Sequence, residues 1–234
     1  MENNNENTEI TAETPATSEE NSSILRDIVE IAESTLVTVF VIVMIFTYIL
    51  HPVNIVGHSM VPTLNKYYDP QLENTDKIFM TTVYTNVKYG DILVIDKDVN
   101  YLLDDNGEPY VPNAQEASPI DECIIKRVIA VGGQIVDIHD GKVYVNGELL
   151  KEPYINEPDS TGDYGYGAFS EQYPIKVPQG YYFVMGDNRN HSTDSRSRSV
   201  GLVKKDQIYG KAIVRYSPIK DFDILTDSWK GPEA

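Results

Sequence analysis

Cysteine is almost absent from this sequence of 234 residues, which has one cysteine, Cys123, and four histidines. A single cysteine cannot form an intramolecular disulfide, and it excludes a structural metal site built on several cysteines. The scattered histidines provide no convincing set of metal ligands. We therefore expect no metal or other cofactor, and the chain is long enough for its fold to depend on a buried apolar core.

Basic residues are scarce as well. The chain has 19 Lys and Arg residues against 36 Asp and Glu residues, which gives a formal net charge of -17. Nucleic-acid binding depends largely on cations that neutralise phosphates, and this chain has no Lys/Arg cluster. We therefore exclude nucleic acid as a partner.

Residues 1–23 lack large apolar side chains almost entirely and are rich in Glu, Asn, Thr and Ser. A segment of this composition cannot offset the conformational entropy that ordering would remove. We expect a disordered, acidic tail over residues 1–23.

An apolar run follows this tail, and residues 34–50 contain no charged side chain. Its length lies near the lower limit for a helix that crosses a bilayer, and apolar residues before it can extend the helix. A cleavable signal peptide would have a basic segment before the run, and a buried core helix is a second alternative. We predict a permanent transmembrane anchor over residues 24–50. Its orientation stays open, because the flanks have almost no Lys or Arg to count.

After Pro52 the pattern changes to short apolar runs separated by turn residues, which is typical of a β-rich domain. The clearest hairpin lies within residues 134–150, where Asp140-Gly141 and Asn146-Gly147 provide two tight turns. The polar stretches between the runs are predicted to be loops or exposed ribbons. We predict strands at residues 77–84, 91–96, 122–131, 181–185 and 207–216.

Three segments contain residues that can carry chemistry. The first is Gly-His-Ser-Met-Val-Pro-Thr-Leu at residues 57–64, shortly after the predicted anchor. A loop in this position can hold Ser59 as a nucleophile. Serine, glycine and proline are also common turn residues for backbone reasons alone, so this segment does not by itself identify a catalytic serine.

The second segment is the strand predicted at residues 122–131, which two adjacent cations interrupt. Period-two alternation places Lys126 on one face of the strand and Arg127 on the other. If the strand is central, burial lowers the pKa of Lys126, and a neutral lysine can act as a general base. If the strand lies at an edge, both cations are solvated. This segment alone leaves both readings open.

The third segment is the polar run Gly-Asp-Asn-Arg-Asn-His-Ser-Thr-Asp-Ser-Arg at residues 186–196. A solvated loop explains such a composition, and a calcium loop is another alternative, although the oxygen ligands lack the EF-hand spacing. In a functional reading, Ser192 and Asp194 orient other groups through short side chains, and Arg196 forms a bridging ion pair.

Together, the three segments resemble the conserved boxes of type I signal peptidases, in sequence, order and separation, and the likeness extends over most of residues 34–217. The resemblance implies a mainly β fold with a core of coiled antiparallel sheets and an inserted hairpin segment, preceded by one transmembrane helix. The extracytoplasmic peptidase domain would cover residues 51–234. Its catalytic core would comprise residues 51–133 and 179–217, and the insertion would cover about 134–178.

The resemblance also assigns roles to residues. The serine of the first box is the nucleophile in this family and the lysine of the second is its base, so Ser59 and Lys126 take these roles here, through an acyl-enzyme. Ser192 would hold the lysine amine by a hydrogen bond. The loop would be braced by Asp194, expected to pair with both Arg127 and Arg196.

Substrates of this family bind as an extended strand beside the nucleophile, with small side chains at positions -3 and -1. By resemblance, the substrate-site neighbours here are Gly57, Met60 and Pro62. An exposed Met60 would rest at the bilayer, although packing is the commoner fate of a lone methionine. Many relatives have a serine at the position of Gly57 whose hydroxyl helps to bind the oxyanion, so backbone N–H groups would bind it here.

The implied activity is the removal of signal peptides from secreted preproteins by a serine endopeptidase of the cell membrane. Its partners would be signal peptides and the lipid bilayer, with a cytoplasmic N-terminus and an extracytoplasmic catalytic domain. Substrate range, oligomeric state and the role of the acidic tail are not determined by the sequence.

Other functions stay open at this point. One alternative keeps Ser59 and replaces the lysine by His191 with Asp187 or Asp194. A second is a soluble self-cleaving Ser/Lys repressor, which the apolar run and the acidic tail disfavour. A third is a membrane-anchored scaffold that has lost catalysis. A peptidase dedicated to one pilus or surface protein is a specialised form of the main hypothesis.

Overall fold

The computed structural model describes residues 16–67, 75–113, 123–155, 161 and 173–226. The chain divides into two units, residues 1–47 and residues 48–234.

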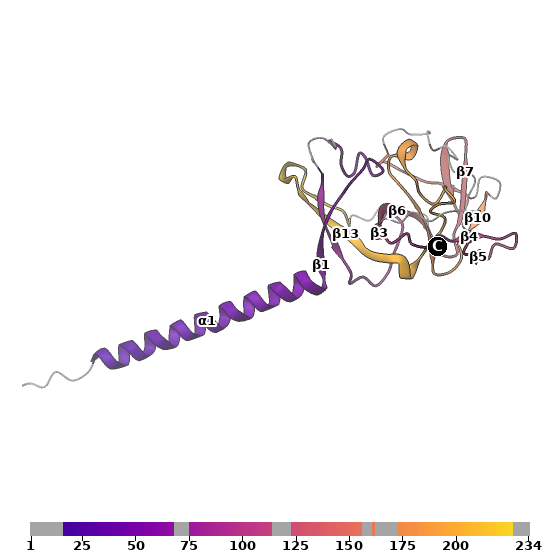
Figure 1. Ribbon diagram of the computed structural model, residues 1–234. Helices are drawn as coiled ribbons and strands as arrows, with labels where there is room; N and C mark the ends of the chain where they lie inside the picture. Colours follow the sequence, from indigo (N-terminus) through magenta and orange to yellow (C-terminus); the bar gives the residue numbers. More distant parts are fainter. Residues whose placement is uncertain (1–15, 68–74, 114–122, 156–160, 162–172, 227–234) are drawn as a thin grey trace, which may run out of the picture. The chain divides into compact units, whose positions relative to one another are not determined.

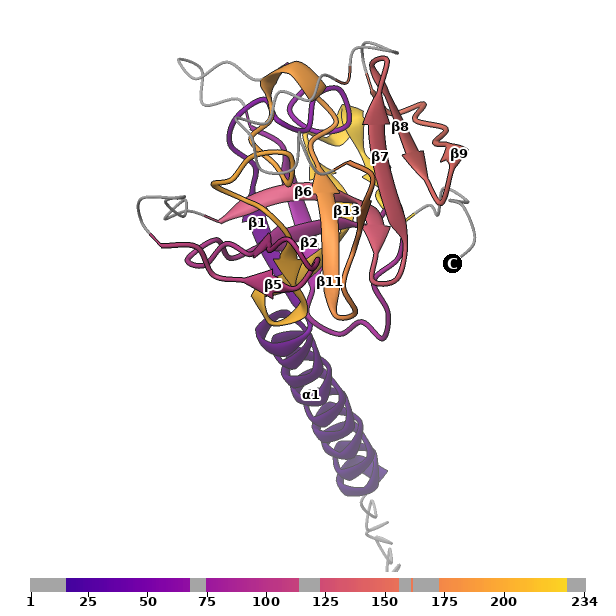
Figure 2. The same cartoon turned by 90° about the vertical axis from the view of Figure 1, so that its right-hand side faces the viewer.

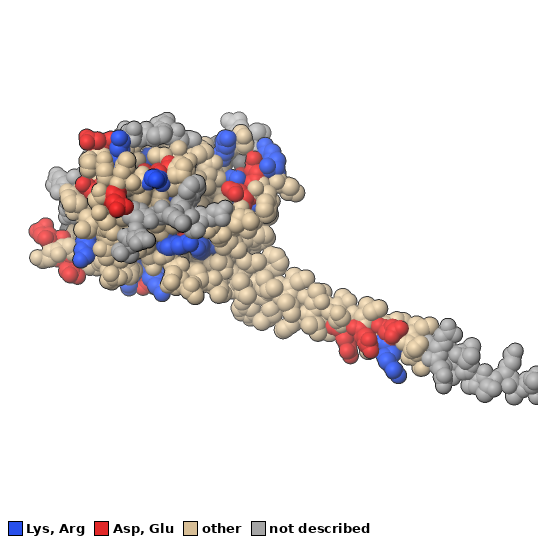
Figure 3. Space-filling view, turned by 180° about the vertical axis from the view of Figure 1, so that it is seen from behind, with Lys and Arg blue, Asp and Glu red and all other residues tan. Residues whose placement is uncertain are grey.

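The first unit contains one long helix, α1 (Ala16–Tyr48) (Figure 1). The stretch Ser22–Tyr48 contains an 18-residue window with a mean hydropathy of 2.2 and is long and apolar enough to cross a membrane. Its 27 residues span about 40 Å as a helix, against about 30 Å for the hydrocarbon core of a bilayer. Figure 3 shows charged side chains only near the N-terminal part of the described helix, followed by an uncharged surface.

The helix begins earlier than the sequence analysis expected. It starts at Ala16 and not at Ile24, so part of the predicted disordered tail is helical, while residues 1–15 lie outside the described residues. Adding a residue to an existing helix costs much less than starting a new helix, so an apolar helix can extend into a polar segment. Within α1 the hydroxyl groups of Thr35 and Thr38 donate hydrogen bonds to backbone carbonyl groups four residues earlier, at 2.7 and 2.8 Å.

The second unit is built mainly from one large antiparallel sheet. Its strand order is β1-β2-β13-β3-β6-β11-β12, and β14 pairs with β13. The strands are β1 (Leu50–Asn54), β2 (Lys77–Thr81), β3 (Ile92–Ile95), β6 (Ile124–Val131), β11 (Tyr181–Met185), β12 (Val203–Lys204), β13 (Ile208–Ser217) and β14 (Asp223–Ile224). The predicted mainly β fold after one N-terminal helix is confirmed.

A second, smaller sheet has the strand order β10-β7-β8-β9, and Figure 2 shows β7, β8 and β9 to one side of β11. Its strands are β7 (Ile135–His139), β8 (Lys142–Val145), β9 (Glu148–Leu149) and β10 (Ile175–Lys176). These strands lie within the segment expected to be an insertion. The remaining elements are the β4–β5 pair (Leu102–Leu103 and Pro109–Tyr110) and three short 3₁₀ helices, η1 (Arg189–His191), η2 (Lys205–Gln207) and η3 (Ile219–Asp221).

Local backbone chemistry explains the two hairpins of the smaller sheet. Asp140 and Gly141 have φ angles of 51° and 75°, and Asn146 and Gly147 have φ angles of 54° and 79°. Positive φ at both central residues is the requirement of a type I′ turn, which Asp-Gly and Asn-Gly satisfy with little strain. The predicted hairpin is therefore present.

One apolar cluster joins the two sheets. Ile129 of β6 and Phe183 of β11 belong to the same buried cluster as Val136 and Val143 of the smaller sheet. Because Ile129 and Phe183 belong to this cluster, the smaller sheet supports β6, which contains the second box, and β11, which leads into the third box.

Candidate active site

Ser59 lies in a loop that follows β1. The loop turns at Gly57, whose φ angle of 86° favours glycine. Met60 is buried in a cluster with Ile55 and Leu64, so the residue after Ser59 fixes the loop to the core. Ser59 itself is half-buried.

Lys126 lies in β6, which has β3 on one side and β11 on the other. The strand is therefore central, and the edge-strand reading is wrong. The side-chain nitrogen Nζ lies 2.9 Å from Oγ of Ser59 and 2.8 Å from the carbonyl oxygen of Ile125. The structure thus brings the serine of the first box to the lysine of the second, 67 residues away.

Burial controls the charge of Lys126. The residue is 4% exposed, and desolvation lowers the pKa of its amine to about 8, against the opposing effect of the nearby charges of Asp194 and Asp187. An amine with this pKa has a substantial neutral fraction close to neutral pH, and only the neutral form can accept a proton from a hydroxyl group.

Arg127 forms a different ion pair from the one expected. Its guanidinium group contacts both carboxylate oxygens of Asp187 at 2.8 and 2.6 Å, and both side chains are buried. The expected partner was Asp194. The reason lies in the register, because Met185 lies opposite Arg127 in the β11–β6 pair and Asp187 follows two residues later.

Of the two arginines that were expected to pair with Asp194, only Arg196 does so. The two side chains form two hydrogen bonds of 2.8 Å, and the carboxylate also accepts the backbone N–H of Gly186 at 3.0 Å. Burial raises the pKa of Asp194, but the charge and hydrogen bonds of Arg196 outweigh burial and hold the pKa below its ordinary value. Asp194 and Arg196 therefore brace the loop as a separate pair.

Ser192 lies beside the nucleophile but does not hold the lysine by a hydrogen bond in this structure. Its Oγ is buried, and its interaction with the carboxylate of Asp194 helps to lower the pKa of that acid. Gly186 separates Ser192 from Ser59, and a Cβ added at Gly186 would lie 2.2 Å from Oγ of Ser192 and 2.4 Å from the carbonyl oxygen of Ser59. Only glycine fits between these two serines without a shift.

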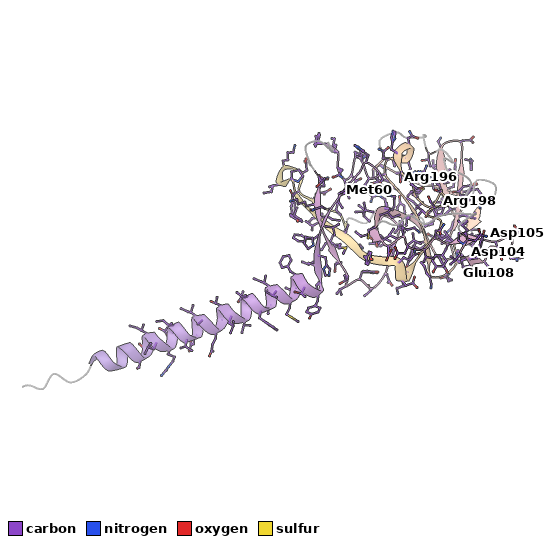
Figure 4. The ribbon with its side chains drawn as sticks, viewed as in Figure 1. Met60, Asp104, Asp105, Glu108, Arg196 and Arg198 are labelled. Carbon is purple, nitrogen blue, oxygen red and sulfur yellow. The ribbon has the colours of Figure 1, made fainter. Side chains whose placement is uncertain are left out.

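A cleft of about 560 Å³ opens beside the Ser59 hydroxyl. Gly57 lines this cleft, whereas Met60 and Pro62 do not; Met60 is labelled in Figure 4. Met60 is 1% exposed. The alternative in which Met60 rests at the bilayer is therefore wrong, and the residue packs in the core. The lining consists of Val53, Asn54, Ile55, Val56, Gly57, His58, Ser59, Val94, Cys123, Ile124, Ile125, Lys126, His191 and Thr193.

Among the residues that the structure describes, the cleft lining contains His191 but no carboxylate. Asp187 and Asp194, the acids that a histidine-based mechanism would need, are held by buried arginines instead. The structure therefore disfavours a Ser-His-Asp arrangement.

Sequence reasoning missed one residue that contacts the nucleophile loop and one buried ion pair of the third box. Asn188 donates its backbone N–H to the carbonyl oxygen of Ser59 at 3.0 Å and its side-chain amide to the carbonyl oxygen of His58 at 3.1 Å. Arg189 forms a buried ion pair with Glu152. Asn188 and Arg189 belong to the third box. Glu152 lies at the edge of a polar stretch whose composition predicted only a loop.

The sequence matches one protein family over most of its length. Residues 28–217 match the family model described as signal peptidase, peptidase S26. The chain is 39% identical over 146 residues to a probable signal peptidase I-2 of Synechocystis sp., which covers 60% of this chain and 62% of that protein. It is 31% identical over 212 residues to signal peptidase I S of Bacillus subtilis, which covers 86% of this chain and 96% of that protein.

The crystal structure of a signal peptidase I from Enterococcus faecalis is 25% identical in sequence, with a TM-score of 0.39, and the match covers 55% of this chain and 98% of that chain. The family model spans most of the sequence, including all three boxes. The chain therefore belongs to the signal peptidase family, peptidase S26.

Proposed function

We propose that this protein is a type I signal peptidase that cleaves signal peptides from secreted preproteins with Ser59 as nucleophile and Lys126 as general base. The observation that carries the proposal is the 2.9 Å separation of Ser59 Oγ and Lys126 Nζ. It is supported by the lowered pKa of the buried amine, because a nucleophilic serine needs an adjacent base that is neutral at working pH.

In the first step, neutral Lys126 takes the hydroxyl proton of Ser59 while Oγ attacks the scissile carbonyl carbon. The resulting ammonium group gives this proton to the leaving amine, and the mature protein departs. Lys126 then removes a proton from a water molecule that attacks the acyl-enzyme. The bond to Oγ breaks, the signal peptide leaves, and the ammonium group returns this proton to Oγ, which restores Ser59 and neutral Lys126. Each step leaves the lysine in the state that the next step needs.

The oxyanion formed in these steps needs hydrogen-bond donors. Gly57 provides no hydroxyl group, so we assign this role to backbone N–H groups of the nucleophile loop, including that of Ser59. The positive φ angle of Gly57 supports this assignment, because it turns the chain just before Ser59.

The cleft beside Ser59 accommodates an extended chain. Its walls are mostly apolar or small side chains from the segments 53–59 and 123–126, which suits small residues at positions -3 and -1 of the substrate. We further propose that α1 anchors the protein in the cell membrane with a cytoplasmic N-terminus. Residues 51–234 would then form the extracytoplasmic domain, with the insertion at 134–178 supporting the core.

The test is cleavage of a preprotein with an Ala-x-Ala site by the full-length protein in detergent. We expect cleavage after the last Ala, and Ser59→Ala and Lys126→Ala should each abolish it. Ser197→Ala is a matched control, because Ser197 pairs with Ser199 outside the cleft. Cleavage that survives Lys126→Ala would sink the proposed mechanism, and no cleavage of several preproteins by the wild type would sink the proposed function.

A further inference from the structure

A buried ion pair connects the insertion to the loop that contains the third box. The guanidinium group of Arg189 contacts both carboxylate oxygens of Glu152, one of them at 2.9 Å, and it also donates to the hydroxyl oxygen of Thr161 at 2.8 Å. The two charged side chains are only 2% and 7% exposed. A bidentate pair in this environment is directional and strongly ordered.

Arg189 also contacts the backbone that lies against the nucleophile loop. Its Nε donates to the carbonyl oxygen of Gly186 at 3.1 Å. Gly186 is the glycine that fits between Ser192 and the backbone carbonyl group of Ser59. A shift of Arg189 therefore moves the surface against which the nucleophile loop rests.

A second contact from the same segment reaches the strand of the base. The ring of Tyr154 lies 4.1 Å from the guanidinium carbon of Arg127, the residue that follows Lys126. The hydroxyl group of Tyr154 donates to a carboxylate oxygen of Glu152 at 3.2 Å, and it lies 3.2 Å from the hydroxyl group of Tyr89. Glu152 thus contacts Tyr154, which packs against the neighbour of the base, and Arg189, which contacts Gly186 beside the nucleophile loop.

We propose that Glu152 is a positioning residue of the signal peptidase reaction, which holds Gly186 and Arg127 in place and thereby sets the distance between Ser59 and Lys126. This inference rests on the proposed function. It gives the insertion a defined task, because Glu152 belongs to the insertion, three residues after the end of β9, and does not line the cleft.

The central variant is Glu152→Gln in the full-length protein, with Glu148→Gln as control. Glu148 lies four residues earlier in the same segment and is exposed. The Gln side chain keeps the size of Glu152 and removes the charge that pairs with Arg189. We expect kcat to fall by about 10- to 100-fold with little change in KM, because a small misplacement of reacting groups has effects of this size. The control should behave as the wild type does.

The pH profile separates positioning from general destabilisation. A loosened contact admits water to Lys126, so the acid limb of kcat/KM should move to higher pH in Glu152→Gln. A variant that is only less stable would lose activity equally at every pH and keep the position of the limb.

Amide hydrogen exchange tests the contact without any activity. Peptides that cover residues 184–196 should exchange faster in Glu152→Gln than in Glu148→Gln, while β7 and β8 should exchange alike in both. This readout also works if the wild type cleaves no preprotein, so failure of the proposed function and failure of this inference are distinguishable. Unchanged exchange in Glu152→Gln would overturn the inference.

The double variant Glu152→Met/Arg189→Met addresses the loss of stability that an unpaired buried charge causes. Replacing both members of a buried pair by apolar side chains often restores stability. We expect the melting temperature to recover while kcat stays low, because the contact between Arg189 and Gly186 is missing. Recovery of both quantities would show that the pair contributes stability alone and would overturn the inference.

Discussion

The amine of Lys126 lies 2.9 Å from the hydroxyl oxygen of Ser59, at the centre of a sheet where only 4% of the lysine is exposed. The same burial that brings the two groups together lowers the pKa of the amine. The position of Lys126 in β6 therefore explains both its contact with Ser59 and its lowered pKa.

The acid limb of kcat/KM should lie near pH 8. Lys126 acts as a base only when neutral, and its pKa is about 8, so activity should rise as the pH increases through this value. A histidine base would place the limb near pH 6.5. Measurement of kcat/KM between pH 5 and 10 distinguishes the two, and His191→Gln should leave the profile unchanged. A limb near 6.5 that vanishes in that variant would contradict the lysine mechanism.

Lys126→Met should stabilise the fold while it abolishes cleavage. At pH 7 the lysine is charged in the unfolded chain and poorly solvated in the native state, because its pKa falls from 10.5 to about 8 on folding. We expect the free energy of unfolding to rise by about 1–3 kcal/mol at pH 7.

The gain from Lys126→Met should shrink as the pH rises from about 8 to 10.5. In this window the unfolded chain binds a proton at Lys126 that the native state does not bind, so the wild type gains stability with pH. Denaturant unfolding of both proteins at pH 7 and pH 10 provides the comparison. A variant less stable than the wild type at pH 7 would count against the buried, desolvated lysine.

Gly186→Ala should reduce activity by about 100-fold or more, since even small displacements of reacting groups have effects of this order. The added Cβ would lie 2.4 Å from the carbonyl oxygen of Ser59, so the nucleophile loop must move. Gly132→Ala is a matched control, because its Cβ would lie 2.8 Å from the backbone at Gln179. It should lower the melting temperature and leave kcat at permissive temperature nearly unchanged. Equal kcat losses in the two variants would contradict the prediction.

Arg127 should be coupled to Asp187 and not to Asp194. Double-mutant cycles with Arg127→Met, Asp187→Asn and Asp194→Asn measure this directly. We expect a coupling energy of roughly 1–3 kcal/mol for the Arg127–Asp187 pair, which forms two hydrogen bonds. The coupling of Arg127 with Asp194 should be close to zero. The reverse order of the two coupling energies would refute the pairing seen in the structure.

Features with local causes were predictable from the sequence. The positive φ angles of Asp140 and Asn146 follow from two-residue turns whose chemistry is contained in the turn itself. The short apolar runs at β6 and β11 likewise predicted both strands. Three short motifs indicated the family. The start of α1 was not predictable from apolar composition, because helix extension needs no apolar side chains once the helix exists.

The residue types of the site can be read from the chain: a serine in a turn after an apolar run, a lysine inside an apolar strand, and a polar loop rich in Asp and Arg. Folding places Lys126 in a central strand, pairs Arg127 with Asp187 and pairs Glu152 with Arg189. These contacts join residues 37 to 67 positions apart. Strand order and register set such contacts. Both depend on how the whole core packs, so a short segment of the chain is not enough to predict them.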